Sequence, residues 1–359
     1  MKNLLVIFGG VSSEHDISLL SACSVIKNVP KEKYRIYMLG ITKQGEMFLY
    51  EGSPDSLPED KWLSDKSLLK KAVISTDRSD RGILVFGEKT EKIKIDVCFP
   101  VLHGKNGEDG TMQGLLTVAG IPFVGCGTAS SAVCMDKALT NSICDINGIP
   151  HARWEYITLH GFNKNGREFS EYCAKKLPLP VFVKPANAGS SVGVTKAKNA
   201  GEIYEALEKA FAHDTRVVVE EGIDGAEVEC AVLGNDEPIA GVVGEIEPCN
   251  EFYDFDAKYI DDGSALHIPA RISAEKIAEV QKLAVKAYKA FGCSGLARVD
   301  FFVQKSDGKV LLNEPNTIPG FTSISMYPML IDKIGIDYGS LIDKLCTLAE
   351  EKWEKEFSK

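Results

Sequence analysis

The length, composition and charge of the chain limit its possible functions. With 359 residues it exceeds what one hydrophobic core usually supports, so we expect two or three domains. Charged residues make up 26% and hydrophobic residues 44% of it, as in ordinary globular proteins. The formal net charge of -10 disfavours nucleic acid as a partner, and the absence of a transmembrane-length apolar stretch disfavours a membrane. The ten cysteines are scattered without metal-binding spacing, which is typical of core residues in a reducing cytoplasm.

The first predicted domain covers residues 1–127. Its apolar patterns predict helices over 16–28 and after Asp109, and strands at 4–8, 34–41, 95–101 and 121–125. The polar stretch that ends near residue 92 shows no clear element. Because strands alternate with helices, we expect a mostly parallel sheet in this domain.

Two further domains are predicted, over residues 128–218 and 219–359. The elements expected in the second are a helix at 136–147, strands at 181–185, 192–196 and 216–220, and a helix at 200–212. The third should hold strands between 228 and 246, a helix at 274–291, a hairpin and two closing helices. Its long irregular segment, 248–263, is of the kind that usually forms a functional lid.

The predicted hairpin of the third domain indicates a metal site. Arg298 and Asp300 share one face of its first strand, and Glu314 and Asn316 share one face of the second. An Asp-Gly turn between the strands brings Asp300 nearly opposite Glu314. Two carboxylates and an amide oxygen suit Mg²⁺, which completes its shell with nucleotide phosphates and water. The alternative is a surface hairpin with a salt bridge, which the apolar flanking residues disfavour.

Two segments of the second domain suggest a phosphate site. Strand 181–185 carries Lys184 into a glycine-bearing loop, 186–194, whose N–H and hydroxyl groups can surround phosphate oxygens. An ordinary tight turn is the alternative. Lys137, at the start of a predicted helix, can reach an anion, although a solvated lysine is the commoner meaning.

Acidic residues at the ends of predicted strands are candidate ligand contacts. Glu220, Glu221 and Glu227 can face the amino and hydroxyl groups of a nucleotide, or be plain exposed acids. Glu14 follows the first strand, where open α/β sheets bind ligands, and can hold a substrate ammonium group. The alternative for Glu14 is a helix N-terminal acid favoured by the helix dipole.

Taken together, these motifs resemble the D-alanine–D-alanine ligases, a family of the ATP-grasp superfamily. The resemblance runs from residue 3 to about residue 348. The segments that carry it are 12–18, 103–110, 135–137, 184–194, 253–259, 297–300 and 313–325. It implies an α/β fold, in which an N-terminal Rossmann-like (pre-ATP-grasp) domain precedes a two-part α+β ATP-grasp fold.

The resemblance also implies roles for individual residues in binding ATP and metal. The residues that would contact ATP are Lys137, Lys184, Ser190, Ser191, Val192, Glu220, Glu221, Glu227 and Lys258. Asp300, Glu314 and Asn316 would bind two Mg²⁺ ions, for which Mn²⁺ is an expected substitute.

Other positions would contact the amino-acid substrates. Glu14 would bind the ammonium group of the first D-alanine, in a hydrogen-bonded set with Ser190 and Tyr259 that ties the lid shut. Arg298 and the Gly320 N–H would stabilise an oxyanion. The remaining two are Ser325, which would receive the carboxylate of the second substrate, and His103, which would lie near both substrates.

The implied reaction is ATP-dependent ligation of two D-alanines through an acyl phosphate, for peptidoglycan precursor synthesis, by a cytoplasmic homodimer. Two departures from the family pattern are Ile324, where a histidine is usual, and Pro315 between two metal ligands. His15 stands where D-serine-using relatives often carry tyrosine, which favours D-alanine as second substrate. The alternatives are a D-alanine–D-serine ligase of the vancomycin-resistance type, a ligase for larger substrates, and a non-catalytic ATP-grasp regulator.

Overall fold

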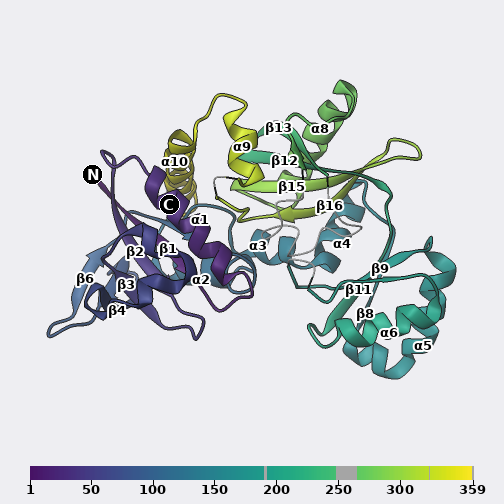
Figure 1. Cartoon of the computed structure of the whole chain (residues 1–359), viewed down its shortest axis with the longest axis horizontal. Helices are drawn as coiled ribbons and strands as arrows, with labels where there is room; N and C mark the ends of the chain where they lie inside the picture. Colours follow the sequence, from purple (N-terminus) through teal and green to yellow (C-terminus); the bar gives the residue numbers. More distant parts are fainter. Residues whose placement is uncertain (190–191, 248–264, 323, 358–359) are drawn as a thin grey trace.

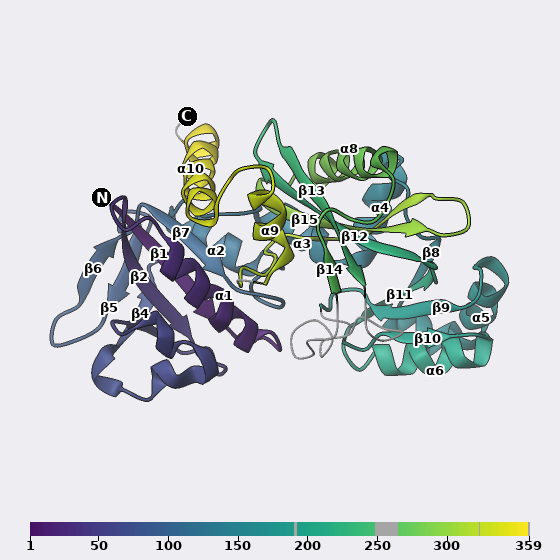
Figure 2. The ribbon, with the colours of Figure 1, turned by 45° about the horizontal axis from the view of Figure 1, so that its top comes forward.

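The strands in the described part of the chain form three sheets that follow one another along the sequence (Figure 1). The computed structural model describes residues 1–189, 192–247, 265–322 and 324–357. The sheet nearest the N-terminus lies at one end of the molecule, and the sheet that carries α5 and α6 lies at the other (Figures 1 and 2). Among the described residues, no helix combines the length and apolarity needed to cross a membrane.

The first sheet has seven strands in the order β6-β5-β4-β3-β2-β1-β7. Their bounds are β1 (Lys2–Gly9), β2 (Tyr34–Ile41), β3 (Met47–Tyr50), β4 (Leu69–Ile74), β5 (Gly82–Val85), β6 (Glu91–Lys94) and β7 (Val97–Val101). Strand β1 is buried on both faces from Leu4 to Phe8, as expected for the central strand of a covered sheet. It pairs in parallel with β2 and with β7.

The prediction of a mostly parallel sheet is wrong for the outer part. From β2 to β6, each strand pairs antiparallel with the next strand along the chain. The stretch in which no element was expected contains β3 to β6 and three short 3₁₀ helices, η1 (Pro54–Ser56), η2 (Pro58–Leu63) and η3 (Lys66–Leu68). Its strands are four to six residues long, and β4 carries the exposed Lys70 and Lys71, which weakens the hydrophobic signal. The strand expected at 121–125 is reduced to a single parallel bridge between Cys98 and Phe123.

Helix α1 (His15–Asn28) connects β1 to β2 within the first sheet. Helices α2 (Thr111–Ala119), α3 (Thr128–Met135) and α4 (Lys137–Asn147) lie between the last strand of the first sheet and the second sheet. The Asp136 carboxylate accepts hydrogen bonds from the N–H groups of Ala138 (3.0 Å) and Leu139 (3.1 Å) and thereby caps α4. Gly148, with φ of 57°, ends that helix in the left-handed conformation. The predicted helix at 136–147 is therefore confirmed within one residue.

The second sheet is antiparallel, in the order β10-β9-β11-β8. Its elements are β8 (Trp154–Thr158), α5 (Leu159–Lys176), β9 (Val181–Pro185), β10 (Thr195–Ala197), α6 (Ala200–Ala210) and β11 (Arg216–Glu221). Helices α5 and α6 pack against each other and form one core with the sheet. We did not predict β8 and α5, and the strand expected at 192–196 begins only at Thr195.

The third sheet has the order β14-β13-β12-β15-β16. Its elements are β12 (Gly225–Gly234), β13 (Ile239–Glu247), β14 (Ala265–His267), α8 (Ala274–Ala290), β15 (Gly295–Gln304), β16 (Val310–Asn316), α9 (Met326–Asp332) and α10 (Tyr338–Phe357). Helix α8 shares a core with Val228, Cys230 and Val232 of β12, whereas α9 shares one with Ala231 and Leu233. Since neighbouring strand residues alternate between faces, α8 and α9 cover opposite faces of this sheet.

The hairpin prediction is confirmed by the pairing of β15 with β16. Asp300 lies opposite Glu314, and Arg298 lies opposite Asn316. Strand β16 is at the edge of the sheet, so Pro315 can stand within it without depriving a further strand of a hydrogen bond. The residues predicted to bind metal are thus held on one backbone ladder.

Candidate active site

A row of carboxylates crosses three strands of the third sheet. Glu229 of β12 lies opposite Asp300 of β15, which in turn lies opposite Glu314 of β16. Arg298 donates two hydrogen bonds of 2.8 Å to Asp300 and forms an ion pair of 2.9 Å with Glu229. Asn316 donates a hydrogen bond of 2.8 Å to the same Asp300 carboxylate. The four predicted residues of the hairpin therefore meet on one surface.

The charge of this surface fits a divalent cation. Three carboxylates in a row face a single guanidinium group, and the side chains of Asp300 and Glu229 are only 12% and 7% exposed. Hard oxygen donors of this kind, gathered where water has little access, are what Mg²⁺ or a similar ion prefers. The prediction missed Glu229, although Glu227 and Glu229 alternate along β12 and so share a face.

The carboxylate row borders a cavity of about 810 Å³, which is within the range of small-molecule sites. The predicted residues that line it are Glu14, His103, Lys137, Arg298, Glu314, Asn316, Gly320, Ile324 and Ser325. They come from the turns that follow β1 and β7, from α4, from the hairpin and from the segment that follows it. The cavity therefore lies between the first and the third sheet, and Ala188 and Gly189 of the loop after β9 also line it.

Lys184 and Glu220 form a buried ion pair beside the cavity, with 2.6 Å between Nζ and the carboxylate. Burial alone would lower the pKa of Lys184, but the negative charges of Glu220, Glu314 and Glu227 raise it. Burial likewise opposes ionisation of Glu220, yet Lys184 and the amide of Asn141, at 2.8 Å, lower its pKa. Both groups are therefore charged at neutral pH.

We expect Lys184→Met to raise the KM for ATP about tenfold or more and to lower the melting temperature. The variant leaves Glu220 buried without its cation, which typically costs about 3–5 kcal/mol. Adding Glu220→Gln should restore stability, because it removes the unpaired charge. Thermal melts and ATP titrations of both variants test this, with the exposed Lys198→Met as control. An unchanged melting temperature in Lys184→Met would contradict the expected burial penalty.

Lys137 connects α4 to the glycine-bearing loop. Its ammonium donates a hydrogen bond of 2.7 Å to the Ala188 carbonyl, and its backbone N–H donates one of 2.9 Å to Ala186. These two hydrogen bonds attach the first residues of the loop to the start of α4, beside the cavity. The remaining predicted residues of the loop and lid, Ser190, Ser191, Lys258 and Tyr259, lie outside the described residues, whereas Val192 lies in a turn just before β10.

Glu221 and Glu227 do not line the cavity among the residues that the structure describes. Both oxygens of the Glu221 carboxylate accept hydrogen bonds of 2.9 Å from Arg153, one from its backbone and one from its guanidinium group. Glu227 lies two residues before Glu229 on β12 and contributes to the raised pKa of Lys184. Glu227 is therefore near the cavity wall, and Glu221 is held by another side chain.

Two glycines lie against the Glu14 carboxylate. A Cβ atom at Gly104, whose φ is +69°, would lie 2.4 Å from Oε2 of Glu14. A Cβ atom at Gly189, in the glycine-bearing loop, would lie 3.1 Å from the same oxygen. The side chain of Glu14 itself is 7% exposed. The structure therefore brings this buried carboxylate next to the loop that carries the predicted phosphate contacts.

The segment after the hairpin forms another wall of the cavity. The Ser325 hydroxyl accepts a hydrogen bond of 2.9 Å from the Thr322 N–H, and a Cβ at Gly320 would lie 2.8 Å from it. Only glycine fits this close approach without a shift. Ile324, which replaces the histidine usual in the resembled family, is 72% exposed at the cavity.

Glu108 is a cavity residue to which we assigned no role from the sequence, although it lies in the segment 103–110. Its oxygens accept hydrogen bonds from the N–H groups of Gly104 (2.8 Å) and Ile318 (3.1 Å). Burial and the charge of Glu14 raise its pKa to about 8. The carboxyl group is therefore largely protonated at neutral pH.

Glu108→Gln should become more stable relative to the unchanged protein as the pH rises from about 5 to 8.5. Since the folded pKa of about 8 exceeds the ordinary value of 4.5, the folded protein binds more protons in this window and loses stability as pH rises. A glutamine cannot ionise and lacks this loss. Melting temperatures of both proteins measured across the window test the difference, and a difference independent of pH would contradict it.

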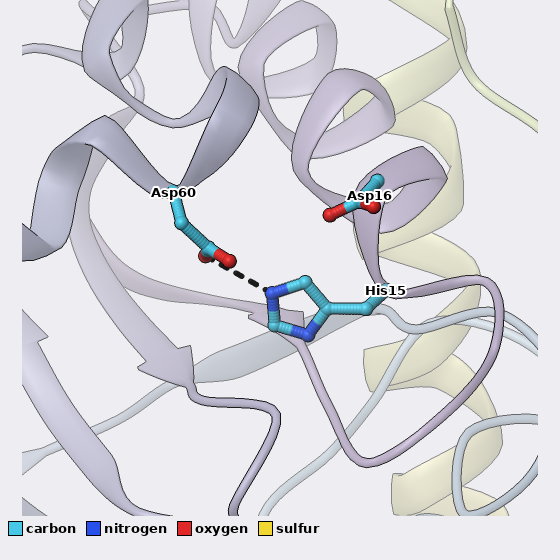
Figure 3. A group of neighbouring side chains, drawn as sticks. All are labelled: His15, Asp16 and Asp60. Atoms are coloured by element: carbon cyan, nitrogen blue, oxygen red, sulfur yellow. Dashed lines mark hydrogen bonds and ion pairs between the residues drawn. The ribbon is translucent and has the colours of Figure 1, made fainter.

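His15 belongs to a separate group of side chains, in which His15 and Asp16 at the start of α1 face Asp60 of η2 (Figure 3). Its Nδ1–H donates a hydrogen bond of 2.7 Å to the Gly10 carbonyl, and Nε2 lies 3.0 Å from Asp60. Asp16 and Asp60 are near enough to suggest a cation site, but the Lys43 ammonium already pairs with them, at 2.9 and 3.7 Å. Within the described residues, His15 is not part of the cavity wall.

Comparisons with known proteins agree with the resemblance noted in the sequence. Residues 3–126 match the family model described as D-ala D-ala ligase N-terminus, and residues 143–347 match the model described as D-ala D-ala ligase C-terminus. A D-alanine–D-alanine ligase of Acetivibrio thermocellus is 50% identical over 98% of this chain and 96% of its own length. One of Caldicellulosiruptor bescii is 49% identical over 97% and 94%.

Solved structures give the same result. The VanG D-Ala:D-Ser ligase of Enterococcus faecalis is 44% identical and superposes with a TM-score of 0.89, covering 97% of this chain and 99% of that one. The D-alanine-D-alanine ligase of Coxiella burnetii is 32% identical, with a TM-score of 0.85 and coverage of 100% and 98%.

Proposed function

Because the chain belongs to the D-alanine–D-alanine ligase family, we propose that it joins two D-alanine molecules with the use of ATP, for peptidoglycan precursor synthesis. The predicted fold class is confirmed, since the mixed α/β architecture is that of ligases with the ATP-grasp fold. The single observation that carries the proposal is the placement of Arg298, Glu314 and Asn316 on the wall of one cavity with Glu14 and Lys137, while Asp300 lies opposite Glu314 on the neighbouring strand.

The reaction begins with activation of a poor electrophile. A carboxylate oxygen of the first D-alanine forms a bond to the γ-phosphorus of ATP, the bond to the β-phosphate oxygen breaks, and ADP leaves. Phosphoryl transfer depends chiefly on positioning and on neutralising charge. In our proposal Lys137 and Lys184 hold the phosphates, and Glu14 holds the ammonium group of this first substrate.

The second step forms the peptide bond. The neutral amine of the second D-alanine attacks the acyl phosphate, and a tetrahedral oxyanion forms before phosphate leaves. Arg298 and the backbone N–H of Gly320 are the proposed oxyanion donors, and Ser325 is the proposed contact of the second carboxylate. The position of these three groups along one cavity wall supports the assignment.

The proposed metal ligands are Asp300, Glu314 and Asn316. Bound divalent cations supply charge neutralisation of the ATP phosphates. The family resemblance implies two Mg²⁺ ions, with Mn²⁺ as a substitute, and two carboxylates with one amide oxygen on the paired strands suit such ions. The additional carboxylate of Glu229 is paired with Arg298 and so helps to hold the guanidinium group in place.

The remaining assignments are proposals that the family resemblance supports. They concern the domains 1–127, 128–218 and 219–359, the homodimer, the cytoplasmic location, and the nucleotide or lid roles of Ser190, Ser191, Val192, Glu220, Glu221, Glu227, Lys258 and Tyr259. Helix α10 belongs to the last domain by sequence, but its Leu341 and Ile342 share a core with β1.

D-Serine is the second candidate for the attacking substrate. The 44% identity to a D-Ala:D-Ser ligase favours it, whereas the curated relatives at 49–50% identity favour D-alanine. We expect D-alanine to be preferred.

One assay distinguishes these proposals. The protein is incubated with ATP, Mg²⁺ and D-alanine, alone or with equimolar D-serine or D-lactate, and phosphate release and product mass are measured. D-Alanyl-D-alanine as the main product supports the proposal. If D-alanyl-D-serine were the main product, D-serine would take the place of D-alanine as the proposed second substrate. The absence of phosphate release in every mixture would favour the non-catalytic alternative.

A further inference from the structure

The five residues Thr317–Phe321 form a short segment, here called the oxyanion segment, between the metal hairpin and α9. It contains Gly320, whose N–H is the proposed oxyanion donor. At one end it continues from β16, which the sheet holds in place. At the other end the buried Phe321 ring packs edge-on against Phe99 of β7, with ring centres 5.6 Å apart. The middle of the segment must be held by other contacts.

Two side chains from the segment between β7 and α2 hold Ile318 by its backbone. One oxygen of Glu108 accepts a hydrogen bond of 3.1 Å from the Ile318 N–H. Nδ1 of His103 lies 3.0 Å from the Ile318 carbonyl oxygen. Because a carbonyl oxygen can only accept, this nitrogen must carry the ring proton. Both polar backbone groups of a residue two positions before Gly320 are thus fixed.

Ser21 of α1 completes the arrangement. Its hydroxyl oxygen accepts a hydrogen bond of 3.3 Å from the Phe321 N–H and lies 3.0 Å from Nε2 of His103. With the ring proton on Nδ1, Nε2 accepts the hydroxyl proton of Ser21. The chain of hydrogen bonds therefore runs from Ile318 through His103 and Ser21 to Phe321. It fixes the backbone both before and after Gly320.

The electrostatic surroundings favour this form of His103. Burial lowers its pKa, the negative charge of Glu14 opposes that effect, and Arg298 reinforces it. Glu14 and Arg298 are also the charged groups that act on Glu108. The imidazole is therefore neutral at pH 7, and its hydrogen-bonding pattern persists.

We propose that Ser21, His103 and Glu108 are positioning residues that aim the Gly320 N–H at the developing oxyanion through the backbone of Ile318 and Phe321. This inference rests on the proposed function. It gives His103 and Glu108 a role that requires no contact with substrate. Small displacements of an oxyanion donor have large kinetic effects, and a misplacement of about 1 Å can cost about 10²-fold in rate.

The first test separates kcat from KM. His103→Ala should lower kcat about 10- to 100-fold and leave the KM for ATP within about twofold, because the phosphate contacts lie elsewhere. His103→Asn should recover part of kcat, since its amide N–H can replace Nδ1 as donor to Ile318. Binding of a tetrahedral phosphinate analogue of the dipeptide should weaken in parallel with kcat. Unchanged kcat in His103→Ala and Ser21→Ala would overturn the proposal.

The second test needs no turnover and so separates this inference from the proposed function. Amide hydrogen exchange over residues 317–321 should be faster in Ser21→Ala and Glu108→Ala than in the unchanged protein. Lys105→Ala, exposed in the same turn as His103, is the matched control and should exchange normally. Equal exchange in all four proteins would overturn the inference even if the wild type makes D-alanyl-D-alanine. Faster exchange without any ligase activity would retain the positioning and reject the function.

Discussion

Replacing Arg298 by alanine should reduce ligation by about 10³-fold or more, the largest effect that we expect from a single substitution. The guanidinium group is the proposed donor to the tetrahedral oxyanion. It also forms the ion pairs with Asp300 and Glu229, so the variant leaves two nearly buried carboxylates without their cation. Breaking a buried pair in this way typically costs about 3–5 kcal/mol. We therefore expect both lower activity and a lower melting temperature.

Divalent cations should restore part of the stability of Arg298→Ala but not its activity. Mg²⁺ can neutralise the carboxylates that have lost the guanidinium group, whereas it cannot replace the hydrogen-bond donor of the oxyanion. Melting curves with and without Mg²⁺, together with phosphate-release rates, separate the two effects. Arg298→Lys is the matched control, because it keeps the charge but not the forked geometry. Near-normal turnover by Arg298→Ala would rule out its proposed role.

Glu314→Gln should reduce ligation by at least about 10²-fold while the fold remains intact. Glutamine keeps one oxygen donor but loses the negative charge that attracts a divalent cation. The backbone pairing with Asp300 does not involve this side chain, so the melting temperature should stay close to that of the unchanged protein. The Mg²⁺ concentration that gives half-maximal rate should rise about tenfold or more.

The hairpin itself offers a control for Glu314→Gln. Asp307 lies in its turn, is paired with Lys309 and is remote from the cavity lining among the described residues. Asp307→Asn removes the same charge from the same hairpin and should leave turnover and Mg²⁺ dependence unchanged. If both variants lost activity equally, hairpin stability rather than metal binding would be the cause.

Local patterns in the sequence were sufficient for the elements with strong periodicity. The hairpin register follows from a period of two and an Asp-Gly turn, and the pairing of Asp300 with Glu314 agrees with it. The helix at 136–147 follows from its aspartate cap and the glycine at its end. The strands β3 to β6 were missed because they are only four to six residues long, and charged residues further weaken the pattern of β4 and β6. Strand β8 and helix α5 were missed as well.

The positioning of the oxyanion segment depends on contacts between distant parts of the chain. Glu108 and Ile318 are 210 residues apart, His103 and Ile318 are 215 apart, and Ser21 and Phe321 are 300 apart. Periodicity within a short segment cannot predict contacts between residues so far apart. The ion pair of Glu229 with Arg298, which joins β12 to β15, could not be predicted for the same reason.

The sequence by itself determined the family and the face of the hairpin on which Arg298, Asp300, Glu314 and Asn316 lie, because motifs and strand alternation depend on spacing within a few residues. Only the tertiary structure decided which carboxylates are neutralised, which are protonated and how Gly320 is held. Those properties depend on burial and on the charges of neighbours, and both arise when distant segments pack together.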